Sequence, residues 1–187
     1  MTYDPTVLPA GLPVPEDDGA ADHLTGLAMP SLRLSSTQGE LDLAELADGL
    51  LVIYVYPRTG RPGIEPPAGW DETPGARGCT PHSCGYRDHA GELRELGARV
   101  VGISAQSLDD QREVAERLGL PHPVIADPEL RLAEALRLPT FEFDGRRLYK
   151  RLALVAEAGR IVKVFYPVFP PDENAADVVA WLRQREP

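Results

Sequence analysis

The chain has 187 residues, of which 43% are hydrophobic and 26% are charged, and its formal net charge is −10. These proportions are typical of one globular domain, and no apolar run approaches the roughly 20 residues that cross a bilayer, so we expect no membrane-spanning segment. Nucleic acids and anionic membranes are bound through basic patches. The acidic balance therefore argues against both partners and favours a small or neutral substrate.

The first 25 residues are predicted to form an extended N-terminal arm. Prolines recur through this segment, and each fixes φ and removes a backbone donor, which disfavours helices and strands. They are Pro5, Pro9, Pro13 and Pro15. The segment also lacks a basic stretch followed by an apolar one, which is the pattern of a secretory signal, so we expect a cytoplasmic protein. Residues 26–187 are expected to form one domain.

Apolar patterns predict the first elements of this domain. Alternating apolar and polar residues around Thr37–Gly39 predict a hairpin over 32–43, and a short helix follows over 43–47. The continuous β-branched and aromatic run Leu50–Tyr56 predicts a strand that is covered on both faces. Pro57 ends this strand, and open α/β sheets place their sites at the C-terminal ends of such strands.

Strands and helices then alternate to the end of the chain. After an irregular, proline-rich segment, we expect a helix over 81–96, a strand over 100–104, a helix over 107–118, a strand over 124–126, a helix capped by Asp127 and running through Leu136, a hairpin over 141–151, paired strands over 152–156 and 161–166, and a helix over 173–183. This order predicts an α/β fold with a central mixed sheet flanked by helices, and it fits the thioredoxin-like architecture.

Two cysteines, five residues apart, carry the clearest chemical signal. They lie in the segment GCTPHSCGYRD, which spans Gly78–Asp88. On an ideal helix their Cα atoms would be about 8.6 Å apart. A disulfide needs roughly 4.4–6.8 Å, so the thiols could join only after the first helical turn unwinds. The amides and dipole at a helix N-terminus favour a thiolate, which makes Cys79 the expected attacking sulfur and Cys84 the resolving one.

Other interpretations of the cysteines stay open. Both could be small buried hydrophobic residues. They could bind zinc together with His82 and His89, although Cys79 and Cys84 diverge by about 140° around a helix and the spacing is unlike that of zinc motifs. The pair could also belong to a non-enzymatic redox-sensing or metal-binding module on the same fold. The favoured interpretation is an enzyme without a metal or a cofactor.

The cysteine segment, placed after a buried strand that ends at Pro57, resembles the active-site segment of peroxiredoxins, in particular the bacterioferritin comigratory protein or peroxiredoxin Q group. The likeness covers roughly residues 29–182. It implies a thioredoxin-like fold and reduction of hydrogen peroxide or organic hydroperoxides by a peroxidatic Cys79. It also implies an intramolecular disulfide with Cys84, a thioredoxin-like protein as reductant, and a monomer or weak homodimer.

The sequence departs from this group before the first cysteine. In this group, the proline, threonine and cysteine belong to one short motif, P-x-x-x-T-x-x-C. In this chain, an inserted active-site loop over 57–78 separates Pro57 from Cys79. Pro57 matches the proline of the motif. Thr59, just beyond the strand end, is the first candidate for the hydroxyl of the motif, and Thr73 is the second.

The resemblance also places an arginine beside the thiolate. The segment RLALVAEAG resembles a late strand of the group, so Arg151 is the expected residue, with Arg147 and Lys150 as rivals. A guanidinium there would stabilise the thiolate, orient the peroxide and spread the charge that develops on the departing oxygen. His82 stands where the group usually has an acidic or amide residue.

Overall fold

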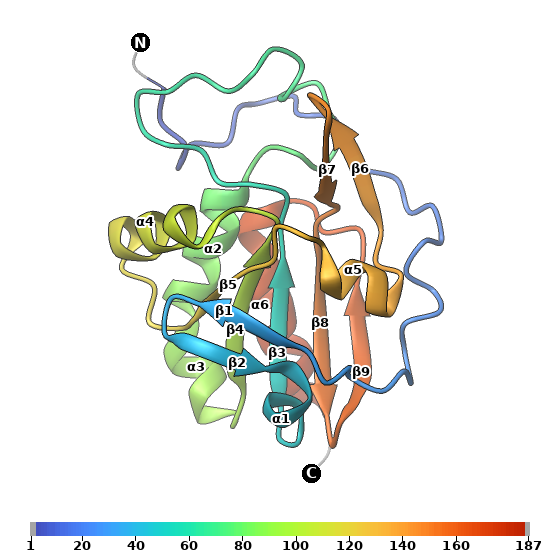
Figure 1. Cartoon of the computed structure of the whole chain (residues 1–187). Coiled ribbons are helices and arrows are strands. Elements are labelled where there is room, and N and C mark those ends of the chain that lie inside the picture. Colours follow the sequence, from blue (N-terminus) through green and yellow to red (C-terminus); the bar gives the residue numbers. More distant parts are fainter. Residues whose placement is uncertain (1–2, 186–187) are drawn as a thin grey trace.

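The computed structural model describes residues 3–185, which fold around a seven-stranded sheet (Figure 1). The strand order is β2-β1-β5-β4-β3-β8-β9. The strands are β1 (Arg33–Ser36), β2 (Gly39–Asp42), β3 (Leu51–Val55), β4 (Arg99–Ser104), β5 (Val124–Ala126), β8 (Leu152–Glu157) and β9 (Arg160–Phe165). The strands β3, β4 and β5 are parallel and the other neighbours are antiparallel, so the sheet is mixed. A second, two-stranded sheet consists of β6 (Thr140–Phe143) and β7 (Arg146–Tyr149).

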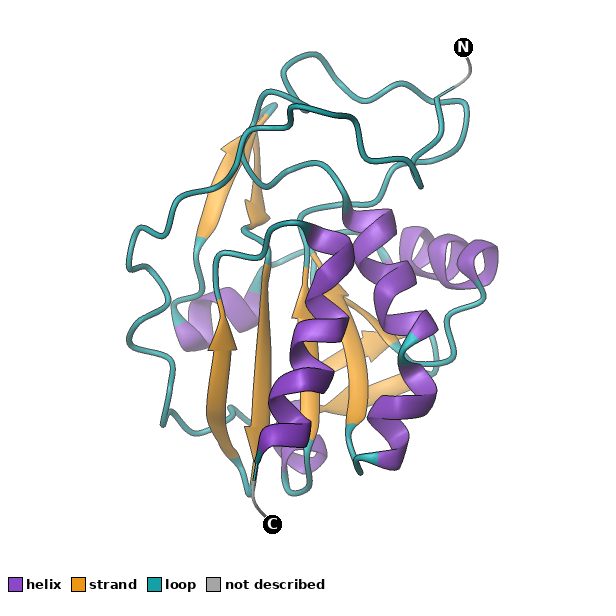
Figure 2. Ribbon diagram, turned by 180° about the vertical axis from the view of Figure 1, so that it is seen from behind, coloured by secondary structure: helices purple, strands orange, loops and turns teal. Residues whose placement is uncertain are grey.

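Helices cover both faces of the large sheet. They are α1 (Leu43–Ala47), α2 (Cys79–Asp88), α3 (Ala90–Glu95), α4 (Leu108–Leu118), α5 (Arg131–Leu136), the 3-10 helix η1 (Pro171–Glu173) and α6 (Asn174–Gln184). The face seen in Figure 2 is covered by α2, α3 and α6. The opposite face carries α1 and α5. This arrangement confirms the predicted α/β fold class. No helix within the described part of the chain is long and apolar enough to cross a membrane.

The strand β3 separates two hydrophobic cores. Its five side chains are all fully buried. Leu51, Ile53 and Val55 pack on the side of α1 and α5, whereas Val52 and Tyr54 pack on the side of α2 and α6. Successive side chains of a strand point to opposite faces, which explains why the predicted run is apolar without interruption. The end of β3 is therefore held from both sides, and this is where the site is built.

Most predicted elements are confirmed, but two helix boundaries differ. The helix predicted over 81–96 begins earlier, at Cys79, and is interrupted at His89, where α2 ends and α3 follows. The helix predicted directly after Asp127 begins only at Arg131. The Asp127 carboxylate accepts hydrogen bonds from the first two backbone amides of α5 across an intervening turn, so the cap precedes the helix by several residues.

The N-terminal arm lies against the domain and ends inside its core. Its described part, residues 3–25, has extended and turn conformations, whereas residues 1–2 of the predicted arm lie outside the described residues. Asp18 forms an ion pair with Lys150 across 2.6 Å. Leu24 is fully buried in the core on the side of α1 and α5. The last residues of the predicted arm are thus part of the packed domain.

Replacing Leu24 by alanine tests this anchoring of the arm. Because the side chain is fully buried, we expect the free energy of unfolding to fall by about 2–5 kcal/mol in a denaturant titration. Ile64→Ala is the matched control, since it removes as many carbon atoms from a side chain that is 61% exposed. It should change the free energy of unfolding by less than about 0.5 kcal/mol. Equal losses in the two variants would contradict the packing of the arm.

Candidate active site

The candidate site lies beyond the C-terminal end of β3, where the inserted loop leads into α2. Pro57, two residues after β3, is buried. Gly78 caps α2 with a φ of 101°, a left-handed conformation that favours glycine. A Cβ atom at Gly78 would lie 2.4 Å from Pro171 Cγ, so a larger residue would also collide with η1. These two constraints place Cys79 at the first position of α2.

Cys79 is a free, buried thiol at this helix N-terminus. Its side chain is 3% exposed, and its sulfur lies 3.6 Å from the carbonyl oxygen of Ala76. The Nη2 atom of Arg151 donates to the sulfur across 3.2 Å. Pro81 lies in the first turn of α2. Backbone N–H groups in a first turn have no intrahelical acceptor, so the missing N–H of proline costs no hydrogen bond there. The guanidinium and the amides of the first turn both favour an anionic sulfur.

Arg151 lies between β7 and β8 and is also 3% exposed. Besides the sulfur, its Nη2 atom contacts the carbonyl oxygens of Gly75, Ala76 and Arg77 at 3.1–3.3 Å. All three belong to the end of the inserted loop. The guanidinium therefore holds this end of the loop beside the cysteine.

The two rival cations contact other groups. Arg147 forms an ion pair with Glu134, and Lys150 forms one with Asp18. Of the three basic residues considered from the sequence, the structure brings only Arg151 to the sulfur.

His82 connects Arg151 to the last helix. Its Nδ1 atom lies 3.0 Å from Arg151 Nη1, and its Nε2 atom lies 3.0 Å from Asn174 Oδ1. Tyr86 donates its hydroxyl to the same Asn174 oxygen across 2.7 Å. Burial, with the neighbouring charge of Arg151 adding to it, holds the pKa of His82 well below its usual range. The imidazole is therefore neutral at physiological pH.

Cys84 lies further along α2 and is also a free thiol. It is partly exposed and lines a cavity together with Arg87, Asp88 and Arg117. Burial raises the pKa of the Cys84 thiol above its ordinary value, because a thiolate loses hydration there. This thiol therefore stays protonated at neutral pH.

Neither predicted hydroxyl contacts the sulfur. Thr59 donates its hydroxyl to Gln106 Oε1 across 3.1 Å, and it lines a separate cavity of about 790 Å³. Thr73 donates its hydroxyl to the carbonyl oxygen of Gly69 across 2.7 Å, although it does line the cavity next to Arg151. Because the loop is inserted, neither threonine lies three residues before the cysteine, where the uninterrupted motif has its threonine.

The zinc ligands considered from the sequence do not form a cluster. His82 is bonded to Arg151 and Asn174, and His89 is bonded to Glu92. Among residues 3–185, no group of three or more His, Cys, Asp or Glu side chains is placed to hold a metal ion.

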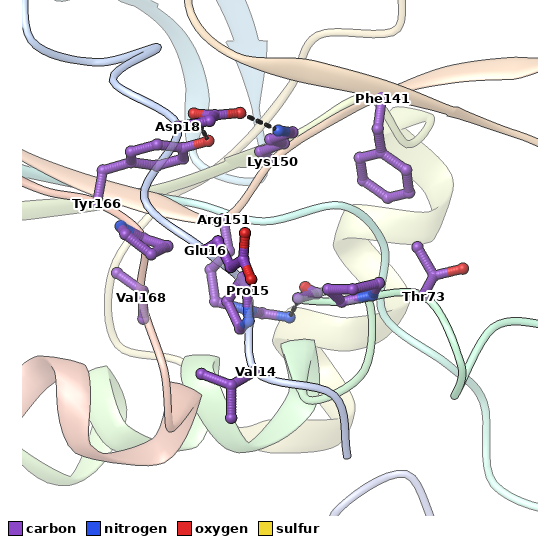
Figure 3. A pocket seen from close by; sticks show the side chains of 13 residues that line it. Val14, Pro15, Glu16, Asp18, Thr73, Phe141, Lys150, Arg151, Tyr166 and Val168 are labelled. Carbon is purple, nitrogen blue, oxygen red and sulfur yellow. Dashed lines mark hydrogen bonds and ion pairs between the residues drawn. The ribbon is translucent and has the colours of Figure 1, made fainter.

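A cavity of about 440 Å³ lies next to Arg151 (Figure 3). Val14 and Pro15 of the N-terminal arm line it, and Phe141 and Val168 add apolar side chains from β6 and from the segment after β9. The contribution of the N-terminal arm to this cavity is not evident from its sequence. Its prolines predict an extended segment, but no pattern in it indicates which surface it covers.

Asp18 fastens the arm at this cavity. Its carboxylate is bonded to the ammonium of Lys150 and accepts a hydrogen bond from the Tyr166 hydroxyl across 2.8 Å, as Figure 3 shows. These two hydrogen bonds lower the pKa of Asp18 to about 2. The carboxylate is therefore ionised at neutral pH. Because the ion pair is partly exposed, solvent screens it and its contribution to stability is modest.

The chain is similar in sequence to several known proteins. The Redoxin family model matches residues 24–180. Peroxiredoxin Bcp of Bacillus subtilis (strain 168) is 28% identical over 155 residues, which cover 80% of this chain and 89% of that protein. Chloroplastic peroxiredoxin Q of Sedum lineare is 25% identical over 162 residues, which cover 84% of this chain and 77% of that protein.

A solved structure shares both fold and sequence with the chain. Peroxidoxin BcpB from Mycobacterium tuberculosis superimposes with a TM-score of 0.69 at 28% identity, over 88% of this chain and 100% of that one. The family match includes the cysteine segment and Arg151. The chain therefore belongs to the Redoxin family and is a peroxiredoxin, an enzyme that reduces peroxides with a thiol.

Proposed function

We propose that this peroxiredoxin reduces hydroperoxides with Cys79 and then closes an intramolecular disulfide between Cys79 and Cys84, as in an atypical 2-Cys cycle. The contact between the Arg151 guanidinium and the Cys79 sulfur carries the proposal. Cys79 also lies at the N-terminus of α2. A guanidinium and a helix N-terminus both favour the thiolate, which is the nucleophilic form of cysteine.

In the first step, the Cys79 thiolate attacks the terminal oxygen of the hydroperoxide. An S–O bond forms as the O–O bond breaks, so the sulfur is oxidised to a sulfenic acid and the peroxide is reduced. The departing oxygen leaves as an anion and takes a proton from water, which yields an alcohol, or water when hydrogen peroxide is the substrate. The Arg151 guanidinium, already beside the sulfur, spreads the charge on that oxygen.

In the second step, the Cys84 thiol condenses with the sulfenic acid, forms an S–S bond and releases water. Two cysteines five residues apart on a helix are separated by about 8.6 Å between Cα atoms, beyond the reach of a disulfide. The first turn of α2 therefore unwinds before the bond forms. A dithiol of the thioredoxin type then supplies two electrons and two protons, which restore both thiols.

The cavity next to Arg151 supports an organic hydroperoxide as substrate. Side chains of Val14, Phe141 and Val168 make part of its wall apolar. A peroxide group held at the guanidinium would direct an organic substituent into this space, where burial of apolar surface adds to binding. Hydrogen peroxide uses only the polar end of the site.

The two cysteine variants separate the two steps. We expect Cys79→Ser to lose peroxide consumption to the level of the buffer, because no other nucleophilic sulfur contacts Arg151. The Cys84→Ser protein should consume about one equivalent of peroxide and then stop with thioredoxin as the reductant. A coupled assay that follows NADPH oxidation through thioredoxin measures both. Sustained turnover by Cys79→Ser would overturn the assignment.

Titration of Cys84 by alkylation provides a further test of the roles. In the Cys79→Ser background, burial raises the pKa of Cys84, so its reaction with iodoacetamide should increase only at pH values above the range of an ordinary thiol. The same protein unfolded in guanidinium is the control and should titrate as an ordinary thiol. A midpoint in the folded protein at or below that of the unfolded protein would contradict the resolving role.

The cavity wall is tested by introducing a charge into it. Val14→Asp should lower the ratio of kcat/KM for cumene hydroperoxide to kcat/KM for hydrogen peroxide by at least about threefold, since a carboxylate disfavours an apolar substituent. Val7→Asp is the matched control, because Val7 lies on the same arm and is 56% exposed, against 63% for Val14, but does not line this cavity. The control should keep the ratio of the wild type. An unchanged ratio in Val14→Asp would remove the cavity from the proposal.

A further inference from the structure

Four charged residues line the cavity next to Arg151, and two of them neutralise one another. The four are Glu16, Asp18, Lys150 and Arg151. Asp18 and Lys150 form an ion pair across 2.6 Å. The Arg151 guanidinium is bonded to the inserted loop and to the Cys79 sulfur. Among residues 3–185, no cation forms an ion pair with Glu16, so its carboxylate charge acts on the cavity without a neutralising neighbour.

Contacts on both sides of Glu16 fix its place at this cavity (Figure 3). The preceding residue, Pro15, lies against the inserted loop, where a Cβ atom added to Gly75 would be 3.6 Å from the proline Cβ. Gly75 belongs to the end of the loop that the guanidinium holds. Two residues after Glu16, Asp18 is bonded to Lys150. The backbone at Glu16 is therefore held in place, while its side chain is exposed and needs no buried partner.

A guanidinium beside an open cavity attracts anions of every kind. Its planar set of donors matches carboxylate and phosphate groups. An organic hydroperoxide is neutral at physiological pH, so a small carboxylate or phosphate bound at Arg151 would take the place of the substrate. A carboxylate in the cavity wall repels such an anion and leaves a neutral molecule almost unaffected. Glu16 therefore opposes the binding of anions that Arg151 would otherwise favour.

We propose that Glu16 is a specificity-determining residue, whose carboxylate selects uncharged organic hydroperoxides over anionic ones. The formal net charge of −10 acts in the same direction, but salt screens distant charges beyond about 10 Å at 0.1 M ionic strength. A charge in the cavity wall is screened less, because it lies close to the path of the substrate. This inference rests on the proposed function, since it concerns which hydroperoxides reach the proposed attacking sulfur.

Two alkylating reagents of similar size test this charge selection without peroxide. Iodoacetate carries a carboxylate, whereas iodoacetamide is neutral. In a Cys84→Ser background at low salt, we expect Glu16→Gln to raise the ratio of the iodoacetate to the iodoacetamide rate constant at Cys79 by at least about threefold, because a like charge is removed. A change in the pKa of Cys79 affects both reagents equally and cancels in this ratio. Added sodium chloride, at about 0.5 M, should reduce the gain by screening. Mass spectrometry measures the product at Cys79.

A matched pair of hydroperoxides extends the test to the substrate. The para-carboxylate of cumene hydroperoxide and its methyl ester differ by one charge and carry the same peroxide group. In the thioredoxin-coupled assay, Glu16→Gln should raise the ratio of kcat/KM for the carboxylate to kcat/KM for the ester by at least about threefold. Glu16→Asp keeps the charge and should keep the ratio of the wild type.

Glu129→Gln is the matched control, because Glu129 is also exposed but does not line this cavity. It removes the same net charge and should leave both ratios unchanged, while thermal melts confirm that all variants fold. An unchanged ratio in folded Glu16→Gln protein, with either pair of reagents, would overturn the proposal, and so would an equal gain in Glu129→Gln. If the alkylation ratio rises but no variant consumes peroxide, the charge selection holds and the proposed peroxidase cycle fails, so the two failures are distinguished.

Discussion

The buried guanidinium of Arg151 is the group around which the site is organised. A positive charge removed from water is costly unless its donors are bonded and an anion lies nearby. The carbonyl oxygens of the inserted loop and the imidazole of His82 bond the donors but carry no net charge. The Cys79 sulfur is the remaining partner of this guanidinium, and the proposed attacking thiolate would be stabilised by it. The start of β8, the end of the inserted loop and the start of α2 meet at this guanidinium, which contacts the loop carbonyl oxygens and the first residue of α2.

The proposed cycle places two opposed requirements on helix α2. Its first turn must be formed for Cys79 to face Arg151, and the same turn must open before Cys84 could form the proposed disulfide. His82 lies inside that turn, and Tyr86 lies beyond it, stacked on Tyr54 at a centroid distance of 4.3 Å. An opening confined to the first turn would break the bonds of His82 and leave those of Tyr86 in place.

Features that depend on short stretches of sequence could be predicted, and those that join distant segments could not. The apolar run of β3 and the start of a helix near Cys79 follow from local patterns, as does the hairpin of β6 and β7. The contact between Arg151 and the sulfur could be predicted only from the resemblance to a family, since no local pattern relates positions 72 residues apart. The partner of His82 is Asn174, 92 residues away, and no periodicity indicates it. The partner of the Thr59 hydroxyl, Gln106, could not be predicted from the family motif, because an insertion interrupts the spacing on which that motif depends.

Hydrogen bonds and an ion pair connect the N-terminal arm and the inserted loop to the surroundings of Arg151. Arg77 of the loop donates to the carbonyl oxygen of Val7 in the arm across 3.2 Å. Lys150 holds the arm through Asp18, and the next residue, Arg151, holds the loop end and the sulfur. The arm is therefore bonded to the residue that precedes the guanidinium in the sequence. In the proposed function, the cavity that would hold an organic substituent and the cation beside the sulfur are joined through these two adjacent residues.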